Sequence, residues 1–504
     1  MWLIIGKERA TIETISAKRD AGVGKGVNNM LFSSSVFLFL FFPLVLFGYY
    51  VPLRRWRLGQ NIFLLLASLF FYAWGEPWFV LVMMISILLN YGLGRLAGRS
   101  YRNGGRNRQV VIFGTLFVNL GIIFIFKYLD FTVANLNALL GIQLPLLGIP
   151  LPIGISFFTF QAISYVIDVL RGREEAQKNP LHIGLYIAFF PQLIAGPIVR
   201  YGTIAEELQN RKETWGDFSE GVCRFVAGLG KKVLISNSLA IVADAAVAKA
   251  SGEGLTLLFA WLGAVSYVIQ LYFDFSGYSD MAIGLGQMFG FHFPANFDYP
   301  LAAKSLSSLW RRWHISLGAW FQDYVYFPMG GSRGSKGRTA WNLFAVWLLT
   351  EIWHGANWTF LVWGLYFYVI LCLEKFTPLK GFLKRHSVWA SVYTLFFFCI
   401  GEVMFRADTL SAGMAHIGAM FGIGTTGVWD AGALFYLWEY KWFYLAGIVC
   451  ATPVFRSLRQ RADRLERPSG LLDAGYTALL MAVLVLSVSY IVKGTYNPFI
   501  YFNF

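Results

Sequence analysis

Long apolar runs, separated by short polar or basic connections, constrain the fold of this chain more than any other feature of its sequence. The hydrocarbon core of a bilayer needs about 20 apolar residues of helix to cross it. Helix is the expected form because backbone polar groups in lipid must be paired within the segment. The runs cover residues 34–52, 59–75, 77–94, 109–127, 151–170, 181–199, 255–273, 339–353, 357–374, 389–404, 440–455 and 474–492.

These runs predict an all-α integral membrane protein with about ten to thirteen transmembrane helices, some of them short, tilted or re-entrant. Only 14% of the residues are charged and 57% are hydrophobic, whereas soluble domains average about a quarter charged residues. Water therefore cannot be the main solvent of this chain. No internal repeat or low-complexity tract divides it, and we expect residues 30–504 to form a single transmembrane domain.

The net charge of +14 would favour nucleic acid as a partner if the protein were soluble. Here the basic residues form short clusters between apolar runs, which is the pattern of cytoplasmic loops. The charge therefore predicts topology and argues against nucleic-acid binding. Through residue 178 the alternation places the first two of these clusters inside, together with Arg171, Arg173 and Lys178, and the loops at 75–77 and 141–150 outside. The clusters are Arg54, Arg55 and Arg57; Arg95, Arg99, Arg102, Arg106 and Arg108; and Arg456, Arg459, Arg461, Arg464 and Arg467.

Two segments differ from this pattern. Residues 1–29 contain basic residues but no spanning run, and the positive-inside bias opposes their translocation. We expect either that Met30 is the true start or that residues 1–29 are a disordered extension. Residues 203–235 mix acidic and basic side chains with a glycine-rich stretch, which indicates an interfacial or cytoplasmic amphipathic section.

Several common kinds of site are excluded by spacing. The four cysteines lie far apart and form no CxxC pair, so neither a disulfide framework nor a thiolate metal site is expected. No HExxH spacing occurs, and we predict no metal and no bound cofactor. Residues 330–334 match GxSxG without the strand-to-helix context of a nucleophile elbow. No phosphate-binding P-loop sequence is present.

Two of the six histidines are candidates for chemistry, since ionisable groups within a membrane-embedded region are costly and usually functional. His314 and His354 lie on either side of a basic, glycine-rich loop centred on Gly334. If both arms are helical and antiparallel, the imidazoles reach a similar depth, roughly 24 Å from the loop at 1.5 Å per residue. We interpret the other histidines as structural or loop residues: His182 at an interface, His292 packed in an aromatic turn, His386 solvated and His416 structural.

A neutral imidazole can take a proton from an alcohol at physiological pH. A second group can orient the imidazole or stabilise a developing oxyanion, which suits acyl transfer to a hydroxyl. A structural polar pair within a helical bundle remains the alternative. Glu351 precedes His354 by three residues and can share its helix face, where it either tunes the imidazole or faces a polar neighbour.

A third polar cluster precedes the histidines in the run 272–280, and its carboxylates are Asp274 and Asp280. Carboxylates beside apolar sequence need partners, and Arg311, Arg312 and Lys304 are the expected ones. A structural ion pair and a contact with substrate both remain open. The arginines can also bind a phosphorylated donor such as coenzyme A, because guanidinium binds phosphate in a bidentate manner.

The run FDFSGYSDMAIGLGQMFGFHFPANFDYPLAAKSLSSLWRRWHISLGAWFQDYVYFPMGGSR, followed by EIWHGANWTFLVWG, resembles the membrane-bound O-acyltransferase (MBOAT) family. It is most similar to the bacterial branch with the alginate O-acetylation protein and the D-alanyl transfer protein of teichoic acids. Similarity extends to MLFSSSVFLFLFFP, LPIGISFFTFQAISYVIDVLRG, FFPQLIAGPIVRY and the terminal NPFIYFNF, and so covers residues 30–504. RRWHISL and WHG at this separation are specific together, whereas either alone is weak.

The resemblance implies a ring of transmembrane helices around a central tunnel. It implies that His354 is the catalytic histidine and His314 the second essential one, and it assigns no role to Glu351, which stands where the family has a small residue. An acyl donor, expected to be acetyl-CoA, would enter from the cytoplasm, with a periplasmic or extracellular partner protein completing transfer to a polysaccharide. Other candidate contacts to substrate or donor are Arg311, Arg312, Trp310, Trp313, Asp274, Ser276, Asp280 and Asn357.

The sequence thus predicts a multi-pass protein of the bacterial inner membrane that O-acetylates an exported polysaccharide, with alginate as the first expectation. D-Alanyl transfer to teichoic acid from a carrier protein is the alternative within the same class. A non-enzymatic transporter or flippase is the alternative from another class, because broken helices and buried charges also occur there. The paired RRWHISL and WHG motifs favour an enzyme.

Overall fold

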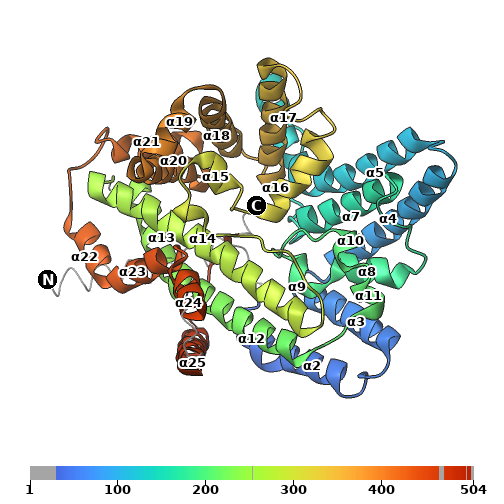
Figure 1. Ribbon diagram of the computed structural model, residues 1–504. Coiled ribbons are helices and arrows are strands. Elements are labelled where there is room, and N and C mark those ends of the chain that lie inside the picture. Colours follow the sequence, from blue (N-terminus) through green and yellow to red (C-terminus); the bar gives the residue numbers. More distant parts are fainter. Residues whose placement is uncertain (1–29, 253, 465–469, 495, 501–504) are drawn as a thin grey trace. The chain divides into compact units, whose positions relative to one another are not determined.

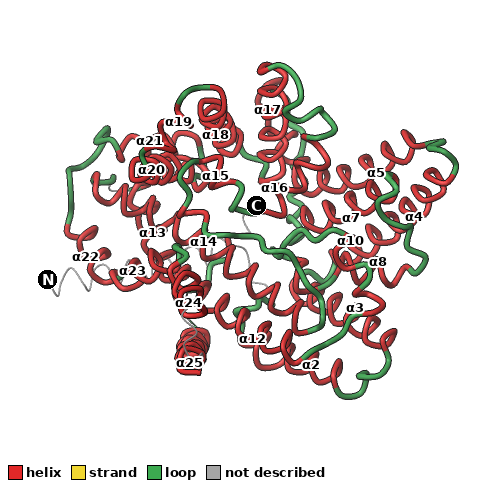
Figure 2. The backbone as a smooth tube through the Cα atoms, in the orientation of Figure 1, coloured by secondary structure: helices red, strands yellow, loops and turns green. Residues whose placement is uncertain are grey.

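The computed structural model describes residues 30–252, 254–464, 470–494 and 496–500. Every regular element in these ranges is helical, and none of the described residues forms a strand (Figure 2). The all-α prediction is confirmed. Residues 1–29 lie outside the described ranges, so the expectation about the start of the chain stays a prediction.

The chain divides into two compact units, which we describe separately. The first unit comprises residues 27–225 and 279–295, and the second comprises 226–278 and 296–504, apart from their undescribed residues. Helices α12 (Trp215–Gly230) and α14 (Leu257–Met288) each contribute to both units. The prediction of a single domain over residues 30–504 stays a prediction.

The first unit is built from the blue to blue-green helices of Figure 1. Its elements are η1 (Phe37–Phe41), α2 (Phe42–Tyr50), α3 (Arg57–Gly75), α4 (Phe79–Arg102), α5 (Arg108–Ile123), η2 (Phe124–Tyr128), α6 (Leu129–Leu140), α7 (Ile155–Leu170), α8 (Pro180–Ala188), α9 (Phe190–Leu193), α10 (Tyr201–Ile204) and α11 (Glu207–Asn210).

The second unit contains the remaining helices, coloured green to red in Figure 1. They are η3 (Lys231–Ser236), α13 (Asn237–Ser251), η4 (Pro300–Ala302), α15 (Leu306–Trp310), α16 (Ile315–Phe321), η5 (Gln322–Tyr326), α17 (Lys336–His354), α18 (Trp358–Phe376), α19 (Leu379–Arg385), α20 (Ser387–Arg406), α21 (Leu410–Met420), α22 (Ala431–Glu439), α23 (Lys441–Cys450), α24 (Val454–Arg464) and α25 (Gly470–Val492).

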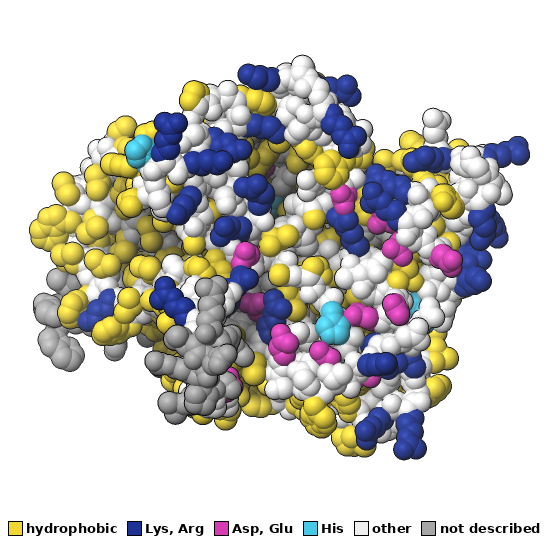
Figure 3. Space-filling view, in the orientation of Figure 1, with side chains coloured by type: hydrophobic (Ala, Val, Ile, Leu, Met, Phe, Trp, Pro, Cys, Tyr) yellow, Lys and Arg dark blue, Asp and Glu magenta, His cyan; other side chains and the backbone are white. Residues whose placement is uncertain are grey.

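Helix length and apolar composition make this a multi-pass membrane protein. Among the described residues, eight helical runs are long and apolar enough to cross a bilayer, and three shorter apolar helices accompany them. Many of their apolar side chains face outward: on α5, Val110, Phe113 and Phe117 are 69–70% exposed, as expected for a lipid-facing surface. Figure 3 shows a face where basic and acidic side chains lie among hydrophobic ones.

Two predicted segments differ from the structure. Residues 181–199 do not form one span, because α8 ends at Ala188 and Phe189 has a non-helical ψ of 114° before the short α9. Residues 203–235 were predicted to form one interfacial or cytoplasmic amphipathic section, whereas their second part continues into a longer helical run; whether that part is interfacial stays a prediction. Residues 215–251 form one helical run that contains a stretch apolar enough to span, and 61% of that stretch is buried.

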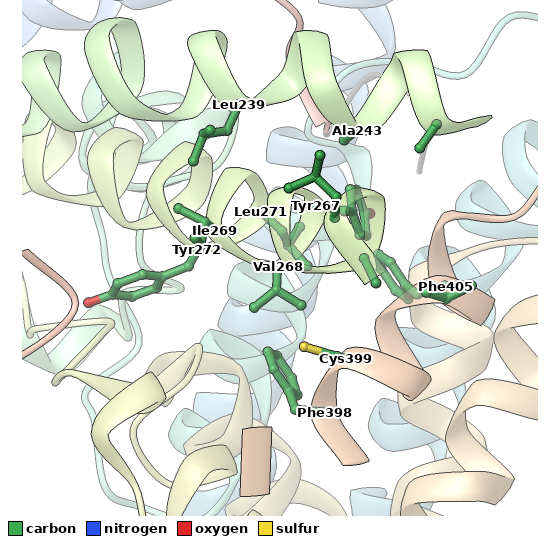
Figure 4. Close-up of a cluster of buried hydrophobic side chains, with 14 of the residues drawn as sticks. Leu239, Ala243, Tyr267, Val268, Ile269, Leu271, Tyr272, Phe398, Cys399 and Phe405 are labelled. Carbon is green, nitrogen blue, oxygen red and sulfur yellow. The ribbon is translucent and has the colours of Figure 1, made fainter. Parts of the chain in front are cut away.

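The core of the second unit lies between α13, α14 and α20 (Figure 4). Val268 of α14 points toward Phe398 and Cys399 of α20, while Leu239 and Ala243 of α13 lie on the other side of α14. Helix α14 also packs closely where α12 continues into η3: a Cβ on Gly277 would lie 2.8 Å from the carbonyl oxygen of Gly228 and 3.0 Å from the backbone nitrogen of Lys232. Glycine therefore permits an approach that any side chain would block.

Candidate functional site

His354 is the last residue of α17, and the helix ends there because Gly355 adopts an extended conformation. The imidazole Nδ1 donates a hydrogen bond to the carbonyl oxygen of Thr350 at 2.8 Å. A carbonyl only accepts, so in the neutral ring Nδ1 carries the hydrogen and Nε2 carries the lone pair. The ring contacts Trp363 and Phe405 at centroid distances of 5.3 and 5.5 Å. The backbone thus fixes the tautomer that presents Nε2 as a base.

His314 lies between α15 and α16 in a left-handed backbone conformation, with φ 44° and ψ 54°. Its Nδ1 donates to Oδ1 of Asn296 at 3.2 Å. The same oxygen accepts hydrogen bonds from the backbone N–H and hydroxyl of Ser316 at 3.1 and 2.9 Å. His314 is only 4% exposed, and burial disfavours a charged imidazole. Asn296 therefore orients a buried, neutral ring.

Trp353 contacts both imidazoles. Its ring centroid lies 5.9 Å from that of His314 and 4.9 Å from that of His354. The predicted helical arm from the loop to His354 is present as α17, whereas the arm from His314 is broken into α16 and the π-helix η5. The structure brings the two predicted histidines together from the two sides of the Gly334 loop.

Residues 310–314 supply aromatic packing and two accessible cations. Trp310 packs edge-on against Trp313, Trp363 and Phe398 at 5.6–6.3 Å. Arg311 is exposed and Arg312 is partly exposed. We expected these arginines to pair with Asp274 or Asp280, and neither of them does.

The predicted carboxylates have other partners. Asp274 pairs with Lys232 at 2.5 Å within the second unit, and Asp280 pairs with Arg224 at 3.0 Å within the first unit. The partners expected for them, Arg311, Arg312 and Lys304, were therefore wrong. Lys232 and Arg224 lie on helices that pack against α14, and no local spacing in the sequence relates them to it.

The remaining predicted contact residues are Ser276, which is buried, and Asn357, which caps a helix. Ser276 is 2% exposed on α14. Asn357 caps α18: its side chain accepts from the N–H of Thr359 at 3.1 Å and donates to the carbonyl of Asp408 at 3.1 Å. Capping accounts for Asn357 without a substrate. Its role in binding stays a prediction.

Sequence reasoning missed Asn296 and Glu402. Asn296 holds His314 from a loop 18 residues upstream, and Glu402 of α20 accepts a hydrogen bond from Nε1 of Trp363 at 3.3 Å. A polar residue next to a buried histidine or tryptophan can be recognised only once the helices are packed. Among the residues that the structure describes, no three His, Cys, Asp or Glu side chains gather as metal ligands would.

A half-buried histidine with a fixed tautomer, His354, thus lies beside a buried one, His314, with Trp353 in contact with both. The comparisons with known proteins concern the chain as a whole. The sequence profile of MBOAT, the membrane-bound O-acyltransferase family, matches residues 66–407. The chain belongs to this family, and it is an O-acyltransferase.

Three relatives show which members it resembles. The probable alginate O-acetylase AlgI of Pseudomonas putida is 39% identical over 94% of this chain and 100% of its own length. The peptidoglycan O-acetyltransferase of Helicobacter pylori is 33% identical over 78% of this chain and 80% of its own. The teichoic acid D-alanyltransferase of Bacillus subtilis is 31% identical over 50% of this chain and 68% of its own. The predicted family is confirmed.

Proposed function

We propose that this protein moves an acetyl group from a cytoplasmic thioester donor, acetyl-CoA, across the bacterial inner membrane for O-acetylation of an exported polysaccharide. The observation that carries the proposal is the hydrogen bond from Nδ1 of His354 to Thr350, which leaves Nε2 as the base. Full-length similarity to a probable alginate O-acetylase supports acetyl as the acyl group and an alginate-type polymer as the first acceptor to test.

In the proposed reaction Nε2 of His354 takes the proton of the acceptor hydroxyl as its oxygen attacks the thioester carbonyl. The new C–O ester bond forms, the C–S bond breaks, and the imidazolium returns the proton to the departing thiolate. General acid–base catalysis of this kind contributes about 10²–10⁴-fold. His314, held by Asn296, orients the acceptor or donor on the other side of Trp353. The exposed Arg311 and the partly exposed Arg312 attract the donor phosphates.

The acceptor hydroxyl in the first step belongs either to the polymer or to a periplasmic partner protein that completes the transfer. Transfer by way of a partner accords with the aromatic rings that pack on His354 and with the burial of His314.

The test uses purified protein in nanodiscs with acetyl-CoA labelled in the acetyl group, and follows hydrolysis and transfer to alginate or a candidate partner. His354→Ala should lower turnover about 10²–10⁴-fold. For His314 the informative variant is His314→Asn, because asparagine tolerates the left-handed conformation that His314 adopts. That variant removes the imidazole without adding backbone strain, and it should also lose turnover.

His386→Ala is the matched control, since His386 is exposed and follows α19; it should keep wild-type turnover. Full activity in folded His354→Ala and His314→Asn would reject the histidine mechanism. Inactive wild type with acetyl-CoA but activity with a D-alanylated carrier protein would replace the acetyl proposal with D-alanyl transfer. Inactivity with both donors, in folded protein, would reject both acyl-transfer proposals.

A further inference from the structure

The end of α17 that lies farthest from His354 belongs to a strongly basic part of the second unit. Two segments form it: residues 329–338, which lead into α17, and residues 375–389, which run from the end of α18 through α19 to the start of α20. Neither segment contains Asp or Glu. Their Lys and Arg side chains are all exposed, and we call these the basic surface: Arg333, Lys336, Arg338, Lys375, Lys380, Lys384 and Arg385.

The basic surface lies at the shared end of three long helices. Helices α17, α18 and α20 contain 19, 19 and 20 residues, and α18 and α20 are among the runs apolar enough to cross a bilayer. The short connection 355–357 makes α17 and α18 antiparallel neighbours. Nζ of Lys375 donates to the hydroxyl of Ser332 at 3.1 Å, which joins the end of α18 to the loop before α17.

The second unit does not neutralise these cations. Among the described residues, no ion pair includes any of the seven. Glu374, next to Lys375, is 2% exposed and accepts hydrogen bonds from the N–H groups of Leu306 and Ser307 at 2.7 and 2.9 Å. Its carboxylate is therefore engaged inside the unit. Basic side chains gather over α17, α18 and α19 in Figure 3, and such a surface attracts an anionic partner.

Exposed aromatic side chains accompany the cations along the chain. Trp341 of α17 is 62% exposed, Phe382 of α19 is 51% exposed and Trp389 of α20 is 65% exposed, whereas Leu383 is buried and anchors α19. Tryptophan at the ends of membrane helices lies at the level of the lipid headgroups. A lipid surface offers hydrocarbon and phosphate side by side, whereas a soluble acidic partner would match the cations alone. The aromatic side chains therefore favour lipid.

The basic surface is separate from the histidine site. Lys336 and His354 are the two ends of α17, and a rise of 1.5 Å per residue puts their Cα atoms about 27 Å apart. The proposed contacts to the donor phosphates, Arg311 and Arg312, instead lie directly before His314 in the chain. An inference about the basic surface therefore does not depend on the proposed acyl transfer.

We propose that the basic surface binds the phosphate groups of anionic phospholipids in the cytoplasmic leaflet. Clusters of Lys and Arg beside membrane helices lie on the cytoplasmic side, where about four to eight of them suffice to recognise anionic headgroups. The arginines bind phosphate in a bidentate manner, while Phe382 and the two tryptophans contact the adjoining acyl chains. The lipid carries a net negative charge, as phosphatidylglycerol does, because the ammonium of a zwitterionic headgroup is repelled by the basic surface.

The test titrates full-length protein in detergent with phosphatidylglycerol or phosphatidylcholine and counts bound lipid by native mass spectrometry. Wild type should bind phosphatidylglycerol more tightly, and added salt should weaken that preference. A variant that combines Lys380→Gln, Lys384→Gln and Arg385→Gln should bind phosphatidylglycerol about 10²-fold more weakly, since each cation near an anionic surface contributes about fivefold. Its affinity for phosphatidylcholine should stay unchanged.

The matched control keeps the charge at the same three positions, by Lys380→Arg, Lys384→Arg and Arg385→Lys, and should keep the wild-type affinity for phosphatidylglycerol. Equal affinities of wild type for the two lipids, or an unchanged affinity for phosphatidylglycerol in the folded glutamine variant, would overturn the proposal. A raised KM for acetyl-CoA in that variant, measured in phosphatidylcholine nanodiscs and with lipid affinity unchanged, would assign the basic surface to the donor instead. Lipid binding is measured without turnover, so its result stands apart from that of the acyl-transfer assay.

Discussion

Nζ of Lys232 lies 2.5 Å from Oδ1 of Asp274, and the two side chains are 1% and 2% exposed. Oδ2 of Asp274 also accepts a hydrogen bond from the backbone N–H of Ile500 at 3.1 Å, and Nζ of Lys232 donates to the carbonyl of Pro498. The two residues of this buried ion pair therefore bind residues 498–500 to η3 and α14.

Breaking this pair should strongly destabilise the protein. Asp274→Asn leaves a buried ammonium without its counter-charge, which typically costs about 3–5 kcal/mol. Lys232→Met combined with Asp274→Leu should recover most of that loss, since neither charge is then buried. Thermal unfolding of protein in detergent measures both effects.

The exposed pair between Arg456 and Asp298 supplies the control for that experiment. Its atoms are 3.2 Å apart, but the side chains are 60% and 49% exposed, and such pairs contribute only about 0–1 kcal/mol. Asp298→Asn should therefore leave the unfolding temperature almost unchanged. Equal effects of Asp274→Asn and Asp298→Asn would contradict the structural role of the buried pair.

Asp274 also shows which of its contacts could be predicted from the sequence and which could not. Its apolar surroundings predicted that it needs a cation, and it has one. Its partner, Lys232, comes from a helix packed alongside and not from the Arg311–Arg312 pair that the motif made conspicuous. The periodicity and hydropathy of the sequence predict the helices, and the spacing of the two motifs predicts that His314 and His354 lie close together. Which side chains meet between two helices depends on their rotation and depth, which the sequence pattern does not specify.

Asn296→Ala should affect stability and activity together. It removes the acceptor shared by Nδ1 of His314 and by both donors of Ser316. Removing one partner of a buried hydrogen bond costs about 1–3 kcal/mol, and the imidazole loses the Asn296 contact that orients it. Asn296→Asp keeps an acceptor oxygen and should retain more activity than Asn296→Ala. Unfolding temperature and turnover in the nanodisc assay measure the two effects, and equal turnover in both variants would argue against an orienting role.

His292 was predicted to pack in an aromatic turn, and that interpretation is wrong. Its Nδ1 lies 2.8 Å from Glu207 and its Nε2 lies 3.4 Å from Asp217, while its side chain is 50% exposed. The aromatic sequence around His292 does not indicate these two contacts, because both acids lie more than 70 residues upstream. Partial burial alone would lower the pKa of His292, but the hydrogen bonds and charges of Glu207 and Asp217 raise it.

The raised pKa of His292 determines whether its contribution to folding stability grows or shrinks as the pH rises. A histidine with a folded pKa above its unfolded value of about 6.5 contributes stability that is fully present below that value. The contribution is lost as pH rises through the folded pKa. Wild type should therefore unfold at a higher temperature than His292→Asn at pH 5.5, and the difference should shrink toward pH 8.5. A difference that stays constant or grows with pH would contradict the charged contact.

Gly364→Ala should test where the Glu351 carboxyl lies. The added Cβ would meet Cδ, Oε1 and Cγ of Glu351 at 1.9–2.1 Å, so the buried side chain must move, and such overpacking costs about 1–3 kcal/mol. In a Glu351→Ala background the carboxyl is gone, and the same glycine substitution should cost much less. The four unfolding temperatures form a double-mutant cycle whose coupling term isolates this contact. The same cost of Gly364→Ala in both backgrounds would show that the carboxyl does not sit over Gly364.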